Sequence, residues 1–180
     1  DRCNWNEFDG RSWSILLREQ PQFASKCDFS KLDGGDWCWL IQKGTAFEDK
    51  CDWSKFTGWN WAELICANSA YAARCDWSKL YGRDWDWVLS FKPQFVYRCD
   101  WSRLDGKNLI EILDVYPKLL DKCDLNLLNA WDWVKLLKRE PKCAAKCPWH
   151  LLDGRMWVRL LLRRPEFSPY CAWEKLSGHD

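Results

Sequence analysis

Apolar side chains recur along the chain at a fixed interval. A cysteine occurs at every twenty-fourth residue with no insertion, at Cys3, Cys27, Cys51, Cys75, Cys99, Cys123, Cys147 and Cys171. When each repeat is numbered from its cysteine as position 1, the repeats read approximately C-D-W-S-K-L-x-G-x-D-W-x-x-L-L-x-x-x-P-x-F-x-x-K. Seven complete repeats and a partial eighth follow one another, so we expect residues 1–180 to form a single tandem-repeat domain.

The spacing of the apolar positions predicts a helix in every repeat. Positions 11, 14 and 15 are apolar and fall on one helical face, as i, i+3 and i+4. Position 10 is Asp, Asn or Ser in six of the seven complete repeats, which predicts the N-cap there. This helix must end before position 19, which is proline in five repeats. Position 8 is glycine in every repeat except for Ala130, and this glycine is expected to end the turn that precedes the helix.

A second short helix is predicted from position 19 to about position 1 of the next repeat. Proline favours the first turn of a helix, and the two repeats without it carry Thr45 or Ser69, residue types that favour an N-cap. The acid at position 2 is expected to cap one further turn, W-S-K-L. The strict alternation of a β-strand is absent. The predicted fold is therefore all-α: an open α-solenoid, or superhelix, of short α-helices with α or 3₁₀ turns.

The unit CDWSKL…GxDWxxLL…PxF resembles Trp- and Cys-rich tandem repeats of uncharacterised bacterial proteins, and the resemblance covers the whole chain. A short unit that mixes α and 3₁₀ helices is also similar in shape to the leucine-rich-variant repeats. The motif residues differ from those of that second family, so this similarity implies a solenoid shape and transfers no functional site.

The chain contains 16 Trp and 11 Cys. Twelve of the Trp occupy positions 3 and 11, where large rings give a short repeat most of its buried area, so we interpret them as core. The repeated cysteines are interpreted as small buried hydrophobes. Neighbouring helices lie roughly 8–10 Å apart, too far for a disulfide, and no C-x-x-C pair marks a metal site. The odd cysteine count favours reduced thiols. We expect no metal and no cofactor.

Charge and composition exclude several classes of function. The 27 Lys and Arg nearly balance the 26 Asp and Glu, so no overall field attracts nucleic acid or an anionic membrane. No apolar run approaches the roughly 18–20 residues that span a bilayer, and no secretory signal is present, so a cytoplasmic protein is expected. We find no nucleophile–base pair around His150 or His179, and we predict that the chain is not an enzyme. The charges at positions 2 and 5 are expected to form solvated ladders.

Positions that differ between repeats are the expected contact positions of a solenoid. Positions 9, 13, 16, 17 and 20 differ most, and positions 9 and 13, i and i+4 on the predicted helix, hold all four Trp outside the scaffold positions. Exposed Trp beside Arg is typical of binding hot spots. The predicted peptide- or protein-binding residues are Trp39, Trp59, Arg83, Trp87, Trp131, Lys135, Arg155, Arg159 and Arg163. The alternative is that these indoles fold down onto their own scaffold.

Two other functions stay open at this point. Residues 131–170 carry nine cations against four acids, and Arg155, Arg159 and Arg163 form an i, i+4, i+8 stripe that suits an anionic partner or nucleic acid. A solvated helix face explains the stripe equally well. The other open function is that of a purely structural spacer. Neither end carries a diverged capping repeat, so we expect a segment of a longer array whose ends associate with one another.

Overall fold

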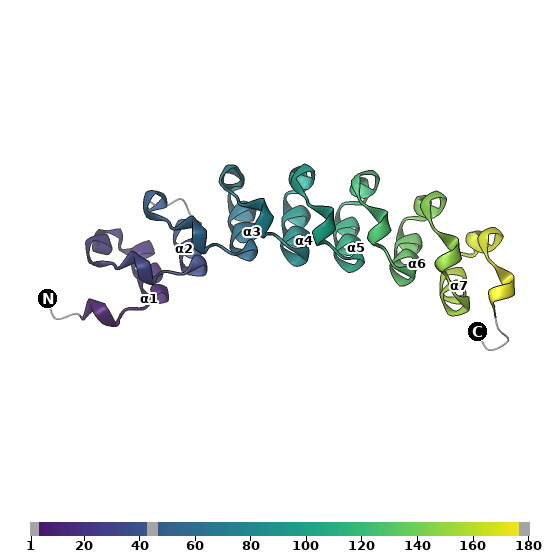
Figure 1. The fold of residues 1–180 in the computed structure, drawn as a ribbon, viewed down its shortest axis with the longest axis horizontal. Coiled ribbons are helices and arrows are strands. Elements are labelled where there is room, and N and C mark those ends of the chain that lie inside the picture. The colour runs from purple at the N-terminus through teal and green to yellow at the C-terminus, as the bar shows by residue number, and fades with distance from the viewer. Residues whose placement is uncertain (1–3, 43–46, 177–180) are drawn as a thin grey trace. The chain divides into compact units, whose positions relative to one another are not determined.

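The computed structural model describes residues 4–42 and 47–176, without the side chain of Lys175. Every regular element in these residues is an α-helix or a 3₁₀ helix, which confirms the all-α repeat solenoid (Figure 1). The chain divides into two compact units, Asp1–Cys99 and Asp100–Asp180, which are described separately. None of the described helices is long and apolar enough to cross a membrane.

Each complete repeat contributes one α-helix, which begins at position 8. The first unit contains α1 (Gly10–Glu19), α2 (Gly34–Ile41), α3 (Gly58–Ala67) and α4 (Gly82–Phe91). The second unit contains α5 (Gly106–Val115), α6 (Ala130–Arg139) and α7 (Gly154–Leu161). Consecutive α-helices pack against each other within each unit.

The remaining elements are 3₁₀ helices. The W-S-K turns are η1 (Trp5–Glu7), η3 (Phe29–Lys31), η5 (Trp53–Lys55), η7 (Trp77–Lys79), η9 (Trp101–Arg103), η11 (Leu125–Leu127), η13 (Trp149–Leu151) and η15 (Trp173–Lys175). The segments near position 19 are η2 (Pro21–Lys26), η4 (Glu48–Lys50), η6 (Ser69–Ala73), η8 (Pro93–Arg98), η10 (Pro117–Lys122), η12 (Pro141–Lys146) and η14 (Pro165–Tyr170).

The segment at position 19 is therefore not the α-helix that the sequence predicted. Proline does begin it, but the segment that runs from this proline to the extended cysteine at position 1 is only six residues long, as in η2 before Cys27. In such a short segment the backbone N–H and C=O groups pair through i→i+3 hydrogen bonds, which form a 3₁₀ helix. In η6 the N-cap is Asn68 rather than Ser69, and its side chain accepts a hydrogen bond from the Ala70 amide at 3.0 Å. Cys3, Thr45 and His179 lie outside the described residues.

The α-helices begin earlier than predicted, because their N-cap is position 7. In α2 the Asp33 Oδ1 accepts a hydrogen bond from the Asp36 amide at 2.8 Å, and the Asp36 Oδ2 accepts one from the Asp33 amide at 3.2 Å. This reciprocal pair is a capping box. Position 10, predicted as the N-cap, is thus the third helical residue, and the glycine at position 8 opens the helix instead of ending a turn.

Position 8 is glycine because the next repeat approaches its backbone. A Cβ on Gly58 would lie 2.2 Å from the Lys79 carbonyl oxygen and 2.3 Å from the Asp84 Oδ2, and Gly10 and Gly34 have matching neighbours. Both clashing groups come from positions 5 and 10 of the following repeat. Ala130, the one exception, is followed by the repeat that carries Met156 in place of a polar residue at position 10.

In five of the complete repeats the scaffold aromatic residues form a stack, whereas the other two repeats carry Leu109 or Leu125 in place of one of the rings. The side chain at position 11 is buried in every complete repeat. The half-buried ring at position 3 lies parallel to it, as in Trp53 and Trp61, whose centroids are 5.4 Å apart at 11°. The position 21 ring contacts the same residue, with Tyr71 lying 6.1 Å from Trp53. The scaffold role of these Trp holds in both units, except that Trp173 is exposed.

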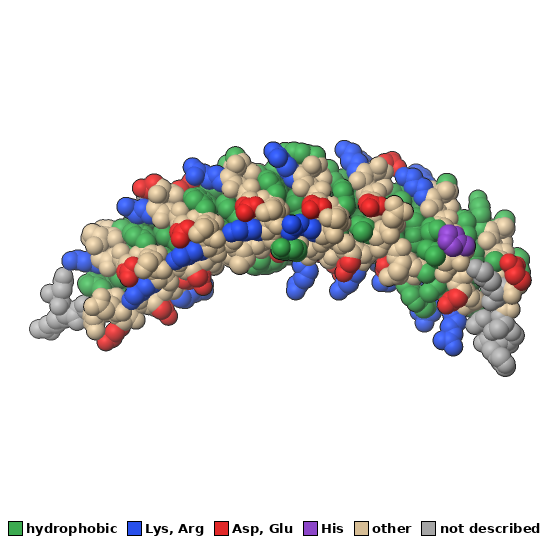
Figure 2. Space-filling view, in the orientation of Figure 1, with side chains coloured by type: hydrophobic (Ala, Val, Ile, Leu, Met, Phe, Trp, Pro, Cys, Tyr) green, Lys and Arg blue, Asp and Glu red, His purple; other side chains and the backbone are tan. Residues whose placement is uncertain are grey.

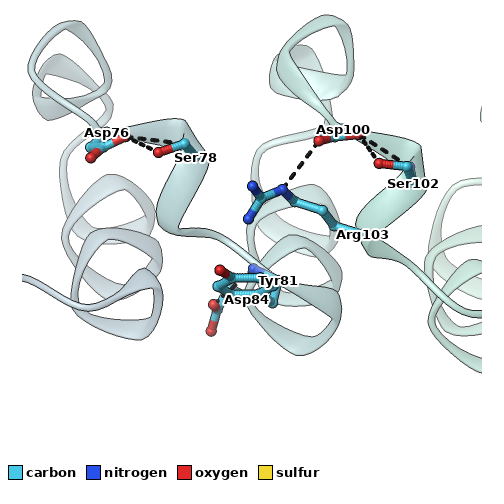
Figure 3. A network of polar contacts seen from close by, with 7 residues as sticks. All are labelled: Asp76, Ser78, Tyr81, Asp84, Asp100, Ser102 and Arg103. Carbon is cyan, nitrogen blue, oxygen red and sulfur yellow. Dashed lines mark hydrogen bonds and ion pairs between the residues drawn. The ribbon is translucent and has the colours of Figure 1, made fainter.

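The acid at position 2 caps the turn that follows it. Asp76 accepts hydrogen bonds from the amide and hydroxyl of Ser78 at 3.2 and 2.6 Å, as the sequence predicted for position 2 (Figure 3). In the next repeat the hydroxyl of Ser102 makes the same bond to Asp100, which lowers the pKa of that carboxyl.

The lysines at position 5 of the first unit are not merely solvated, contrary to the prediction from the sequence. The Lys79 Nζ donates to the carbonyl oxygens of Ser54 and Phe56 at 2.9 and 2.8 Å. Lys31 and Lys55 make the equivalent bonds to the repeat that precedes each of them. On the visible face of the molecule, basic and acidic side chains are interspersed rather than gathered by sign (Figure 2).

Candidate functional site

The four Trp outside the scaffold positions lie on the surface. Their exposed fractions lie between 38% and 41%, against 2% or less for the Trp at position 11. More than half of each of these indoles is nevertheless covered by neighbouring atoms, so the alternative in which they pack onto their own scaffold stays open. Three of them, Trp39, Trp59 and Trp87, belong to the first unit, and Trp131 belongs to the second.

A side chain at position 9 contacts position 13 of the following repeat. The Trp59 and Trp87 rings are 5.5 Å apart between centroids. The Arg11 guanidinium lies 5.5 Å from the centroid of Trp39, which stands in the same relation to it. In the second unit, the Arg159 guanidinium lies 5.0 Å from the Trp131 centroid. The prediction placed positions 9 and 13 together on one helix but missed this contact between helices, whose signal is a constant offset of 28 residues.

The exposed aromatic surface of the first unit continues along α4. The Phe91 ring, which was not among the predicted site residues, lies 4.7 Å from Trp87 and is exposed. Arg83 lines a small hollow with Trp59 and Asp84, so this predicted site residue does lie beside the aromatic surface. Burial raises the pKa of the Asp84 carboxyl.

An open hollow of about 770 Å³ lies on the same surface between α1, α2 and α3. Trp39 and Trp59 both line it, together with the buried side chains of Asp36 and Asn60. In the repeat that contains α2, position 9 is Gly35, which also lines the hollow and carries no side chain to fill it. A Cβ on Gly35 would meet only the Asp33 and Asn60 side chains, at 3.3 and 3.9 Å.

In the second unit the predicted residues form a more basic surface. Lys135 lies 3.8 Å from Asp132, and Arg155 and Arg163 are exposed. Burial lowers the pKa of Lys138, and the nearby Arg159 and Arg163 lower it further. The predicted arginine stripe therefore has Lys138 beside it, while Arg159 lies against Trp131.

The described cysteines are free thiols. Among the repeated cysteines Cys147 and Cys171 are buried as predicted, whereas the others that the structure describes are only half-buried. Burial raises the pKa of Cys38, Cys51 and Cys147 to about 12. These thiols are therefore protonated near neutral pH, and a protonated thiol is a poor nucleophile and metal ligand. The described part of the chain contains no group of three or more His, Cys, Asp or Glu side chains placed to hold a metal ion.

Buried thiols predict a loss of stability in alkali. An unfolded thiol releases its proton near pH 9, whereas folded Cys38 holds its proton to about pH 12. The free energy of unfolding should therefore fall above pH 9, by about 1.4 kcal/mol per pH unit for each fully protected thiol. Urea unfolding at pH 7, 9 and 10 measures this slope. The Cys38→Ala variant should show a shallower slope than the unsubstituted chain, and equal slopes would contradict the assignment.

The chain matches no protein-family model, no curated protein and no solved structure. Its function is therefore inferred from the surface at positions 9 and 13. That surface offers exposed indoles, flanking charges and an open hollow.

Proposed function

We propose that the chain is a non-catalytic repeat scaffold that binds a peptide or protein segment on the surface at positions 9 and 13. The observation that carries this proposal is that three exposed Trp lie next to one another in the first unit. Trp39 and Trp59 line the same hollow, and the rings of Trp59 and Trp87 are in contact. Large, rigid indoles bury much area at little cost in side-chain entropy, which is why Trp dominates binding hot spots.

The separation of packing positions from variable positions within each repeat supports the same function. Positions 3, 8 and 11 make the packing contacts, so the residues at positions 9 and 13 are free to differ without loss of the stack. We infer that the chain belongs with the Trp- and Cys-rich bacterial tandem repeats that it resembles. Binding of an anionic partner by Arg155, Arg159 and Arg163 stays a prediction.

The test is a selection of peptide ligands against the intact chain. Peptides from a random displayed library are labelled, and their affinities for the chain and for its Trp59→Ala/Trp87→Ala variant are measured by fluorescence anisotropy. We expect the double variant to bind at least tenfold more weakly, because truncating a hot-spot residue costs about 2 kcal/mol or more.

The matched control is Trp173→Ala, which removes an exposed indole outside positions 9 and 13. It should leave the affinity unchanged. The proposal would be contradicted if the selected peptides bound the Trp59→Ala/Trp87→Ala variant with the same affinity as the unsubstituted chain. A selection that yields no peptide would favour the structural spacer.

A further inference from the structure

The hollow lies where the pairing of positions 9 and 13 lacks one side chain. In three other repeats an arginine or an indole at position 9 or 13 contacts its counterpart in the adjacent repeat. Here position 9 is Gly35, and the corresponding position 13 is Glu63, which also lines the hollow. Within the described residues, neither a hydrogen-bond donor nor a cation contacts the Glu63 carboxylate.

Acidic groups outnumber basic groups around this hollow. The lining carries four carboxylates and two cations. Both cations are already engaged, because the Lys31 Nζ donates to the carbonyl oxygens of Asn6 and Phe8, and the Arg11 guanidinium lies over Trp39.

One of the four carboxylates is deeply buried. Asp36 is only 8% exposed, and the Asp33 amide is its one hydrogen-bond donor among the described residues. Desolvation raises the pKa of the Asp36 carboxyl. A cation that entered the hollow would stabilise both the Asp36 and the Glu63 charges.

One indole of this surface, that of Trp39, already accepts guanidinium groups from within the chain, those of Arg11 and Arg18. The Arg18 Cζ lies 4.1 Å from the centroid of Trp39, within the range of a cation–π contact. Trp59 presents a second indole to the hollow. A planar guanidinium both stacks on indoles and forms paired hydrogen bonds with carboxylates, which an ammonium group does less well.

We propose that the hollow between Trp39 and Trp59 binds an arginine side chain of the partner peptide, which takes the place that position 9 leaves open at Gly35 and pairs with Glu63. This inference rests on the proposed function and names the residue type that the surface recognises. The first unit therefore prefers peptides that present an arginine.

The test uses the intact chain with ¹⁵N-labelled Trp, whose indole signals are assigned by single Trp→Phe variants. The probe is the peptide acetyl-Gly-Ser-Arg-Ser-Gly-amide, and its control carries citrulline, the neutral analogue of arginine. The arginine peptide should shift the indole signals of Trp39 and Trp59. The citrulline peptide should bind at least tenfold more weakly, since it offers neither the charge nor the full set of donors.

Two variants place the binding in the hollow. Gly35→Arg supplies the side chain from within the chain and should abolish the shifts, and unchanged circular dichroism shows that the variant is folded. Glu63→Gln should weaken binding about tenfold. The matched control Glu111→Gln alters position 13 of a repeat in the second unit, where Glu111 lies 3.9 Å from Lys107, and should have no effect.

Equal binding of the two peptides, or unchanged binding by Gly35→Arg, would overturn the arginine assignment. The proposed function is judged separately, by whether selected peptides require Trp59 and Trp87. A chain that binds such peptides but ignores the arginine probe would keep the proposed function and lose this inference.

Discussion

Replacing Gly58 with alanine is expected to lower the free energy of unfolding by about 3 kcal/mol or more. The new Cβ would lie 2.2 Å from the backbone oxygen of Lys79, which cannot move without displacing η7 and the repeat that contains it. Its second neighbour, Asp84 Oδ2, accepts the amide of Tyr81 at 3.1 Å and is held in place by that bond (Figure 3). Urea unfolding followed by far-ultraviolet circular dichroism measures the loss.

The matched control is Gly35→Ala, one residue further into the equivalent α-helix. Its Cβ would meet side-chain atoms only, at 3.3 and 3.9 Å. Alanine is the better helix former, so the free energy of unfolding should stay within about 1 kcal/mol of the unsubstituted value. Equal losses in the two variants would show that position 8 is glycine for a reason other than contact between repeats.

Trp61→Ala is expected to cost about 3–5 kcal/mol. The Trp61 ring is 1% exposed and packs against Trp53 on one side and Phe56, at 4.9 Å, on another. Removing it leaves a cavity between α3 and η5 that the neighbouring rings, held by their own contacts, cannot fill. Thermal and urea unfolding both measure this cost.

A second variant separates packing from hydrogen bonding at the same position. The Trp61 Nε1 is buried, and no acceptor contacts it in the described part of the chain. Trp61→Phe therefore removes volume but no hydrogen bond, and it should cost clearly less than Trp61→Ala. A larger cost for Phe than for Ala would contradict the role of this ring as a filler of space.

The repeat and its core followed directly from the sequence because both depend on contacts that recur in every unit. The helix start did not, since positions 7 and 10 both carry N-cap residue types. Local preference alone cannot rank Asp33 against Asp36, and the capping box uses both. The 3₁₀ character of η2 and its equivalents depends on the length available before the extended cysteine, which helix propensity does not measure.

The candidate site was predicted in part. Trp39, Trp59, Trp87 and Trp131 were found because they depart from the repeat, and all four are exposed. The pairing of these side chains across repeats was not predicted, because contact between positions 9 and 13 depends on how far one repeat is displaced along its neighbour. Gly35 gave no signal in the sequence, since its importance lies in the space that it leaves beside Trp39.

The most direct test of the division between scaffold and binding positions is the urea unfolding curve of the Trp59→Ala/Trp87→Ala variant. Both rings are only partly buried and contact each other at 5.5 Å, so their loss should lower the free energy of unfolding by about 1–2 kcal/mol and leave the helical signal intact. A loss as large as that of Trp61→Ala, or the disappearance of the helical signal, would place these indoles in the core and contradict that division.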